Sequence, residues 1–450
     1  MSGYEAIKQL AKETNCNIPD LLALARQNDP FFVGAPAQKR MAQWFASLWE
    51  DFGFSTGVHL RRVHYRLISE SEPTGPNGKP YENTEGCWND LCNAGKYARH
   101  LALVDPAAFV DRRNPEPHIY MNAPEEEPGW DYYFPEWSLP EIPTKLRAWL
   151  DVPELWATGY EYEDGLQPYH VEVWCEKSTM NSELLPVCRS QAANLVTGVG
   201  FMSITSVVEL LSRVVELDKP CRILYVSDFD PAGGSMPVSV ARQIEFFISE
   251  YAPDADIRLD PLILTGAQVE EYELPRTPIK DDDKRRQGWE ARNGAGAVEL
   301  DALEALYPGE FARIVEETLQ EFRDPDLPSR QASIEEQAQD ALTARGSEVM
   351  EESSNELAYI RTEVATIARS YEDRLATLNA ELQSELEPYR GRLGNLRQAV
   401  QSALDALEPT LPRLPEPQTP PEANGWLFDG CREYFDQLAA YKSHQDGDAQ

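Results

Sequence analysis

The pattern of apolar and polar positions is most informative at residues 223–226, where Ile-Leu-Tyr-Val is followed closely by Asp228 and Asp230. A continuous apolar run that ends in a turn is typical of a parallel-sheet strand covered on both faces. A Gly pair at 233–234 then opens a segment with a helical pattern. Since open α/β sheets bind ligands beyond the carboxyl ends of their strands, we expect both aspartates to lie at a binding crevice.

An earlier segment has the same plan. Residues 171–175 read Val-Glu-Val-Trp-Cys, so that Glu172 and Trp174 alternate with the residues on either side of them. Glu176 follows directly. A helix, a short strand over 193–199 and an amphipathic helix over 203–215 are expected before the next strand. Right-handed crossovers would bring the strand ends to one edge of a parallel, Rossmann-like sheet. The predicted fold class is therefore α/β.

Carboxylates that meet at such an edge indicate a bound cation. Two acids held close together repel each other unless a cation lies between them, and a divalent metal that prefers oxygen ligands suits this position. An Asp-x-Asp pair is by itself also common in solvated turns and at helix caps. The third acid, Glu176 at the end of the earlier strand, favours a metal site over a plain turn.

One Glu followed later by Asp-x-Asp resembles the Toprim fold of topoisomerases, primases and related nucleases. Downstream stretches make the order similar to the Toprim half of the topoisomerase VI A subunit and of its meiotic double-strand-break relatives: Gln268–Pro275, Lys280–Asp283 and Ala297–Leu303. The resemblance implies that Glu176, Asp228 and Asp230 hold Mg²⁺. It covers the middle of the chain and, through a second motif, part of the N-terminal region.

That second motif lies in residues 58–68, which predict an amphipathic helix with Arg61 and Tyr65 one turn apart on one face. A core or rim tyrosine is the plain interpretation of such a spacing. The topoisomerase VI A subunit, however, carries a winged-helix domain before its Toprim domain, with an Arg-x-x-Tyr-Tyr motif whose second Tyr attacks DNA. The resemblance implies that Tyr65 is the nucleophile and Arg61 its cationic neighbour, with His64 in place of the first Tyr.

Basic residues of this N-terminal region are the predicted DNA contacts, although solvated helix ends are the alternative. They are Arg61, Arg62, Arg66, Lys96 and Arg99. The formal net charge of −35 is unusual for a protein that binds phosphate. Since residues 39–113 are close to neutral and the acid excess lies elsewhere, the charge leaves DNA binding open. An acidic protein with a protein partner remains an alternative.

Composition divides the 450 residues into several parts. We expect a helical and winged-helix-like DNA-binding domain (1–113), a linker (114–148), a Toprim domain (149–330), an α-helical coiled coil (331–408), a Pro-rich spacer (409–424), and a C-terminal helix with a tail (425–450). The coiled-coil region is not part of the topoisomerase VI A pattern. Its apolar stripes at 357–382 and 393–407 fit either an antiparallel hairpin or a dimeric coiled coil.

The family implies Mg²⁺-dependent cleavage of double-stranded DNA by a type IIB topoisomerase-like subunit, with a 5′-phosphotyrosine link and a homodimer. The sequence contains no Gly-rich phosphate loop, so strand passage would need a separate ATPase partner, and the coiled coil could dock another subunit. Two alternatives remain: a tyrosine-independent Toprim nuclease of a bacterial defence complex, and a non-catalytic DNA-binding scaffold. With no apolar run of membrane length and no signal-peptide pattern, we expect a cytoplasmic, nucleoid-associated protein.

Overall fold

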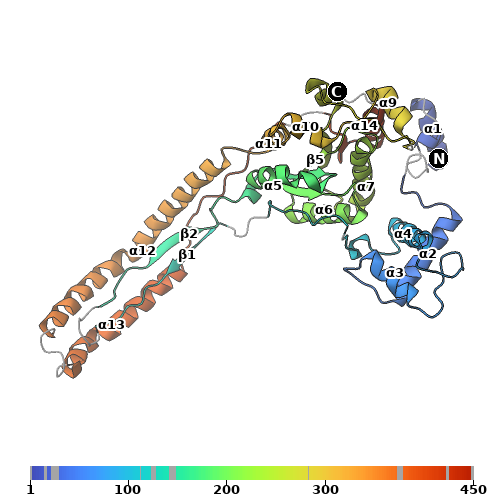
Figure 1. Ribbon diagram of the computed structural model, residues 1–450. Coiled ribbons are helices and arrows are strands. Elements are labelled where there is room, and N and C mark those ends of the chain that lie inside the picture. Colours follow the sequence, from blue (N-terminus) through green and yellow to red (C-terminus); the bar gives the residue numbers. More distant parts are fainter. Residues whose placement is uncertain are drawn as a thin grey trace. The chain divides into compact units, whose positions relative to one another are not determined.

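The computed structural model describes residues 3–14, 18–21, 30–111, 113–122, 128–140, 148–281, 283–371, 379–421 and 425–446. Pieces of the predicted linker (123–127, 141–147), coiled coil (372–378), spacer (422–424) and tail (447–450) lie outside the described residues. The protein is mixed α/β and divides into two compact units (Figure 1). The first unit comprises Met1–Asn122, Pro168–Arg323 and Pro420–Gln450, and the second Ala123–Gln167 and Asp324–Thr419.

A mostly parallel five-stranded sheet forms the centre of the first unit. Its strand order is β4-β3-β5-β6-β7, and only β7 runs antiparallel to its neighbour β6. The strands are β3 (His170–Cys175), β4 (Asn194–Thr197), β5 (Cys221–Val226), β6 (Ile257–Ile263) and β7 (Phe428–Asp429). All side chains of β3, β4 and β5 are buried, as the apolar runs predict for strands covered on both faces.

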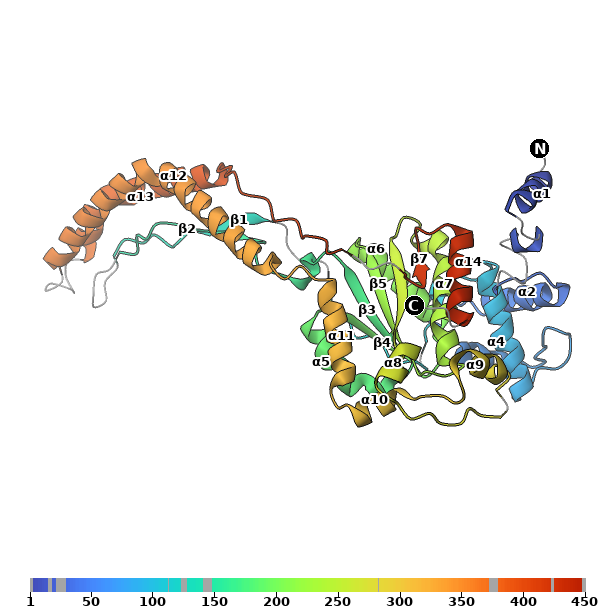
Figure 2. The ribbon, with the colours of Figure 1, turned by 90° about the horizontal axis from the view of Figure 1, so that it is seen from above.

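Helices cover both faces of the sheet (Figure 2). One apolar core joins α5 and α11 to the strands, and a second joins α6 and α7 to the opposite face. The helices of this part are α5 (Asn181–Ser190), α6 (Ile204–Leu217), α7 (Met236–Tyr251), α8 (Gly266–Glu271), α9 (Arg286–Asn293), α10 (Leu300–Leu306), α11 (Glu310–Glu321) and α14 (Tyr434–Asp446). Short 3-10 turns are η4 (Ser178–Met180) and η5 (Gly233–Ser235). The predicted order of strands and helices around both acidic motifs is confirmed.

Helices dominate the N-terminal part of the same unit. They are α1 (Gly3–Thr14), α2 (Pro36–Asp51), α3 (Leu60–Ile68) and α4 (Glu85–His100), with 3-10 turns η1 (Ile18–Leu21) and η2 (Pro106–Ala108). The aromatic side chains Phe45 and Trp49 of α2 pack with Val63 of α3 and Leu91 of α4 in one core. Between α3 and α4, the chain turns back on itself through an antiparallel bridge from Thr74 to Pro80.

The second unit consists of a two-stranded ribbon and a helical hairpin. Strands β1 (Gly129–Tyr133) and β2 (Glu154–Thr158) pair antiparallel, η3 (Asp164–Leu166) follows, and the long helices are α12 (Leu327–Tyr371) and α13 (Asn379–Asp405). The Tyr371 hydroxyl donates to Glu385 (2.5 Å) and the Tyr389 hydroxyl to Glu363 (3.5 Å), so α12 and α13 run antiparallel. The hairpin, one of the two predicted arrangements, is therefore the one this chain forms (Figure 1).

The two units divide the chain differently from the predicted domains. Residues 149–167, expected in the Toprim domain, belong to the second unit because β2 pairs with β1 and the Gln339 amide of α12 bonds to the backbone of Leu155 and Ala157. The C-terminal segment, expected as a separate helix, belongs to the first unit because β7 extends its sheet. Among the described residues, no helix is long and apolar enough to cross a membrane.

Candidate metal centre

The structure brings Glu176 and Asp228 together at the carboxyl ends of adjacent strands. β3 and β5 pair in parallel with Cys175 opposite Val226, so the residues that follow them emerge side by side. The Glu176 N–H donates to the carbonyl of Val226 (3.1 Å), and the Asp228 N–H donates to Oε1 of Glu176 (3.0 Å). These contacts fix both carboxylates at the edge that the sequence indicates.

Glu176 carries an oxygen that lacks a partner. The residue is 4% exposed, and its Oε2 is buried without a hydrogen bond among the described residues. Burial, reinforced by the contact with the Asp228 carboxyl group and by its charge, raises the pKa of Glu176 to about 8, although the bond from the Asp228 N–H acts to lower it. A divalent cation would neutralise this arrangement, so the donor oxygens fit a hard metal ion.

The two oxygens of Asp228 have different partners. Oδ1 accepts a hydrogen bond from the backbone N–H of Leu300 (2.8 Å), while Oδ2 lies 2.7 Å from the ammonium of Lys177. Lys177 also pairs with Glu299, and with Asp301 at 3.5 Å. Although its burial acts to lower the pKa of Lys177, hydrogen bonds to Asp228 and Glu299 outweigh that effect and raise it. An internal cation therefore already binds part of the acidic cluster.

Asp230 caps the turn that follows β5. Its Oδ1 accepts hydrogen bonds from the N–H groups of Ala232 (2.8 Å) and Gly233 (2.6 Å). Burial raises the pKa of Asp230 despite these bonds, and the charge of Asp228 adds to the increase. The turn also requires Gly233, because a Cβ there would lie 2.0 Å from the carbonyl oxygen of Asp228. Asp230 therefore caps the turn, which is one of the two roles that the sequence allows for an Asp-x-Asp pair. Its Oδ2 takes no part in these two hydrogen bonds.

A pocket of about 540 Å³ opens onto these carboxylates. Its lining comes from the segments that follow β3, β4 and β5 and from the starts of α7 and α10: Glu176, Lys177, Ser178, Thr179, Gly198, Val199, Gly200, Asp228, Asp230, Ala232, Met236 and Asp301. The loop after β4 is tied to the loop after β3, since the Gly200 N–H donates to the carbonyl of Glu176 (3.1 Å). The three predicted ligands therefore share one cavity.

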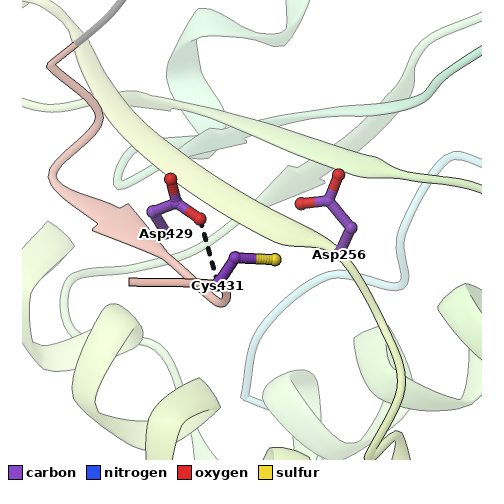
Figure 3. A group of neighbouring side chains, drawn as sticks. All are labelled: Asp256, Asp429 and Cys431. Atoms are coloured by element: carbon purple, nitrogen blue, oxygen red, sulfur yellow. Dashed lines mark hydrogen bonds between the residues drawn. The ribbon is translucent and has the colours of Figure 1, made fainter. Parts of the chain in front are cut away.

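Another group of possible ligands lies at the other end of the sheet. The ligand atoms of Asp256, Asp429 and Cys431 all lie within 4.8 Å of one another (Figure 3). Among the described residues, Glu176, Asp228 and Asp230 do not form a group with that spacing. Arg222 Nη2 lies 2.9 Å from Asp256, and Arg258 Nε lies 3.6 Å and 3.4 Å from Asp256 and Asp429. These arginines offset the charge of both aspartates, while Oδ1 of Asp256 is buried without a hydrogen bond among the described residues. No motif or spacing in the sequence indicated this group.

Tyr65 and Arg61 lie on the exposed face of α3, as predicted. Tyr65 is 56% exposed, and neither residue is among those lining the acidic pocket. His64 is buried, with Nδ1 2.8 Å from the Tyr81 hydroxyl and Nε2 3.2 Å from Oδ1 of Asn83. His64 therefore anchors the helix from which Tyr65 projects.

The predicted DNA contacts differ in their surroundings. Arg61, Arg62, Arg66 and Lys96 are exposed. Arg62 and Arg66 rest over the rings of Phe54 and Phe52, at 5.6 Å and 4.8 Å from the ring centroids. Arg99 is packed instead: its Nε donates to the carbonyl of Gly95 (3.3 Å), its guanidinium lies 4.6 Å from the Phe109 ring centroid, and burial lowers its pKa to about 10. Arg99 is thus the least accessible of the five.

A charged network inside the sheet was missed by sequence reasoning. Glu172 is fully buried, although the alternating pattern of its strand suggested a polar face. Arg213 of α6 binds it through Nε (2.8 Å) and Nη2 (2.9 Å), and His170 and Trp174 bind it at 2.9 Å and 2.8 Å. Burial would raise the pKa of Glu172, but the charge of Arg213 outweighs it and lowers the pKa well below its usual range.

Models of known protein families were compared with the chain, and none matches it. A comparison with curated proteins likewise gives no match. The function is therefore inferred from the chain's own residues and their geometry.

Proposed function

We propose that this chain is a Mg²⁺-dependent DNA-cleaving protein whose metal is held by Glu176, Asp228 and Asp230. The observation that carries the proposal is the Oε2 of Glu176, buried beside Asp228 at the aligned ends of two parallel strands and without a hydrogen-bond partner in the described part of the chain. Folded proteins rarely bury a polar atom without a hydrogen-bond partner, so this oxygen calls for an explanation. Its position at a pocket, beside a second carboxylate and with a raised pKa, supports a functional site. DNA is the proposed substrate because of the motif order, with Arg61, Arg62, Arg66 and Lys96 as exposed cations.

A Toprim-like domain is part of the proposal. A parallel sheet with helices on both faces, a Glu after one central strand and Asp-x-Asp after its neighbour support it. The helices α2, α3 and α4, with the turn bridged by Thr74 and Pro80, support a winged-helix-like domain in front of it. The antiparallel hairpin of α12 and α13 is additional to both.

The chain's own residues would divide the chemistry between them. A bound Mg²⁺ would act as a Lewis acid that stabilises the charge developing on the phosphate. Glu176 and Asp228 supply carboxylates whose positions are fixed by backbone hydrogen bonds, and Asp230 holds the turn between them and α7. Such preorganisation is what lets charged groups act without rearrangement during the reaction.

Tyr65 is the proposed nucleophile. Its phenol oxygen forms a bond to the phosphorus, the bond from phosphorus to the 3′ oxygen breaks, the phenol proton passes to solvent and the 3′ oxygen takes one up. Arg61, one turn away on the same exposed helix, would stabilise the negative charge. Because Tyr65 does not line the pocket of its own chain, the proposal includes a homodimer in which each Tyr65 serves the other subunit's metal. Strand passage would need a separate ATPase subunit.

The absence of Tyr65 from the described pocket lining also favours a second candidate, a nuclease in which the same carboxylates activate water. Both candidates require Glu176, but only the first requires the phenol oxygen. In a third case, a non-catalytic scaffold, no cleavage would occur at all.

Supercoiled plasmid incubated with the protein and Mg²⁺, with and without protease digestion of the products, separates these cases. The tyrosine route predicts DNA covalently attached to protein, lost in Tyr65→Phe and in Glu176→Gln. Tyr4→Phe is the matched control, because Tyr4 has the same exposure of 56% on another helix. Free nicks from Tyr65→Phe, with Glu176→Gln inactive, would establish the nuclease. No cleavage by the wild type, alone or with added partner subunits, would contradict both enzymes.

A further inference from the structure

Lys177 is a residue at the acidic pocket to which the proposed function assigns no role. It follows Glu176 directly, pairs through its backbone with Val199 and lines the pocket with its side chain 25% exposed. Its ammonium contacts three carboxylates, Asp228 at 2.7 Å, Glu299, and Asp301 at 3.5 Å. One positive charge therefore faces three negative charges, with those of Glu176 and Asp230 nearby.

The contacts of Asp228 show why Lys177 and a metal ion would compete. Oδ1 of Asp228 accepts the Leu300 N–H, so Oδ2 is the oxygen of this carboxylate that is not held by the backbone and is the more available to a cation. The ammonium of Lys177 holds that oxygen. A cation that binds through Oδ2 must therefore displace the ammonium or share the oxygen with it, at a cost in affinity.

The other two partners determine where a displaced ammonium would remain. Glu299 and Asp301 lie just before and within the start of α10, and their side chains are 60% and 64% exposed, at the rim of the site. They can retain Lys177 after Asp228 has released it. An ammonium is a compact charge with several hydrogen donors, and lysines in this form are common phosphate ligands.

We infer that Lys177 is a phosphate-binding residue that the metal releases from Asp228 and that Glu299 and Asp301 keep at the mouth of the pocket. This inference rests on the proposed function, since it assumes a metal at Asp228 and a phosphodiester substrate. It gives the cluster of five acids and one lysine two tasks: three carboxylates hold the metal, and two position the cation that contacts the nucleic acid.

The test measures metal binding and DNA cleavage separately on the full chain. Calorimetric titration with Mn²⁺, without DNA, is performed on the wild type, Lys177→Gln, Lys177→Arg and Lys8→Gln. Lys8 is an exposed lysine of α1 that does not line the pocket, so Lys8→Gln removes the same charge at another position. Lys177→Gln is expected to bind Mn²⁺ roughly five- to tenfold more tightly, because the competing ammonium is gone. Lys177→Arg and Lys8→Gln should bind like the wild type.

The rate at which supercoiled plasmid is cleaved at saturating Mn²⁺ should fall in Lys177→Gln, although its affinity for Mn²⁺ rises. Lys177→Gln should lose roughly tenfold or more in rate, and Lys177→Arg should recover part of it because its guanidinium also binds phosphate. A residue with only a structural role would weaken both properties when replaced. Unchanged or weaker Mn²⁺ binding by Lys177→Gln would overturn the competition, and unchanged cleavage would overturn the phosphate contact. If neither the wild type nor Lys177→Gln binds Mn²⁺, the proposed metal site itself is wrong.

Discussion

The carboxyl group of Glu176, at the end of β3, affects both the stability of the fold and the proposed binding of a metal. Oε1 of Glu176 accepts the Asp228 N–H, while Oε2 is buried and has no hydrogen-bond partner among the residues that the structure describes. Without a cation, burial and the neighbouring Asp228 make the ionised form unfavourable, so Glu176 retains its proton to higher pH than an ordinary glutamate. The metal-free protein should therefore be destabilised by the ionisation of this group.

The pH dependence follows from that shift. The pKa of Glu176 is about 8 in the folded protein, against 4.5 for an ordinary glutamate, so the folded state binds the proton more tightly. Stability from this group is present at low pH and is lost as the pH rises from about 5 through about 8. In EDTA at about pH 8.5, the free energy of unfolding of Glu176→Gln should exceed that of the wild type by about 2 kcal/mol, and its melting temperature should be higher. Near pH 5 the variant should be no more stable than the wild type.

Mg²⁺ provides the control for this prediction. At about pH 8 it should raise the melting temperature of the wild type and leave Glu176→Gln and Asp228→Asn unchanged, because a ligand that binds only the folded state stabilises it. A constant difference between wild type and Glu176→Gln across this pH range would show that Glu176 does not titrate as inferred.

Glu172 is a second residue whose role depends on a buried charge. Arg213 forms two hydrogen bonds to it inside the core. Glu172→Gln would leave the guanidinium buried without its counter-charge, which typically costs about 3–5 kcal/mol. Urea unfolding of this variant should show that loss of stability. Glu216→Gln changes an exposed glutamate on α6, the helix that carries Arg213, and should stay within about 0.5 kcal/mol of the wild type. Equal stability of both variants would contradict the network's importance.

These residues also show what a sequence pattern can and cannot predict. Glu176 and Asp228 were predictable because their positions depend on local features, namely where a buried strand ends. The partners were not: Arg213 lies 41 residues from Glu172, and Glu299 lies 122 residues from Lys177. Their pairing depends on how helices pack against the sheet, which periodicity does not encode. The alternation over 171–175 was misleading for the same reason, since Arg213, the charged partner that allows Glu172 to be buried, comes from a covering helix.

On the scale of elements, segments with a clear apolar pattern were predicted, and the two-residue strand β7 was missed. The expected helix over 203–215 is α6 (Ile204–Leu217), and the expected strand over 171–175 is β3 (His170–Cys175). β7 has only two residues, Phe428 and Asp429, too few to show an alternating pattern. Its register with Arg258 and Leu259 of β6 is a contact over a long sequence separation. The aromatic residues near it were therefore assigned to a helix.

The position of β7 leads to a prediction about the C-terminal segment. Phe428 is 3% exposed and packs in the core that α6 and α7 form with the sheet. Phe428→Ala should lower the free energy of unfolding of the first unit by about 3–5 kcal/mol, because it leaves a large cavity. Phe435→Ala is the matched control: this phenylalanine is 41% exposed, and its loss should cost about 0.5 kcal/mol or less. Thermal or urea unfolding monitors both, and a comparable effect of the two would refute the packing role.

On the scale of the whole molecule, the helical hairpin bears on how copies of the chain associate. The apolar stripe of α12, including Leu357, Ile360 and Val364, is covered by Leu386 and Leu393 of α13 within the same chain. The sequence alone could not choose between this hairpin and a dimeric coiled coil, because both satisfy the same apolar spacing. With its stripe already buried, the hairpin has no need of a second copy to cover that stripe.

We therefore expect subunit association to be independent of residues 358–390, here called the distal hairpin. The Arg392 guanidinium of α13 pairs with Glu356 of α12, so the two helices lie next to each other at this level. Deleting residues 358–390 and joining the ends through a short Gly-Ser loop should thus leave the rest of the hairpin intact, because loop closure between adjacent ends costs little. Light scattering should give the same number of subunits for the shortened and the full-length protein. A full-length dimer that becomes a monomer on shortening would instead assign the subunit contact to the distal hairpin, and it would require a different arrangement for the proposed exchange of Tyr65 between subunits.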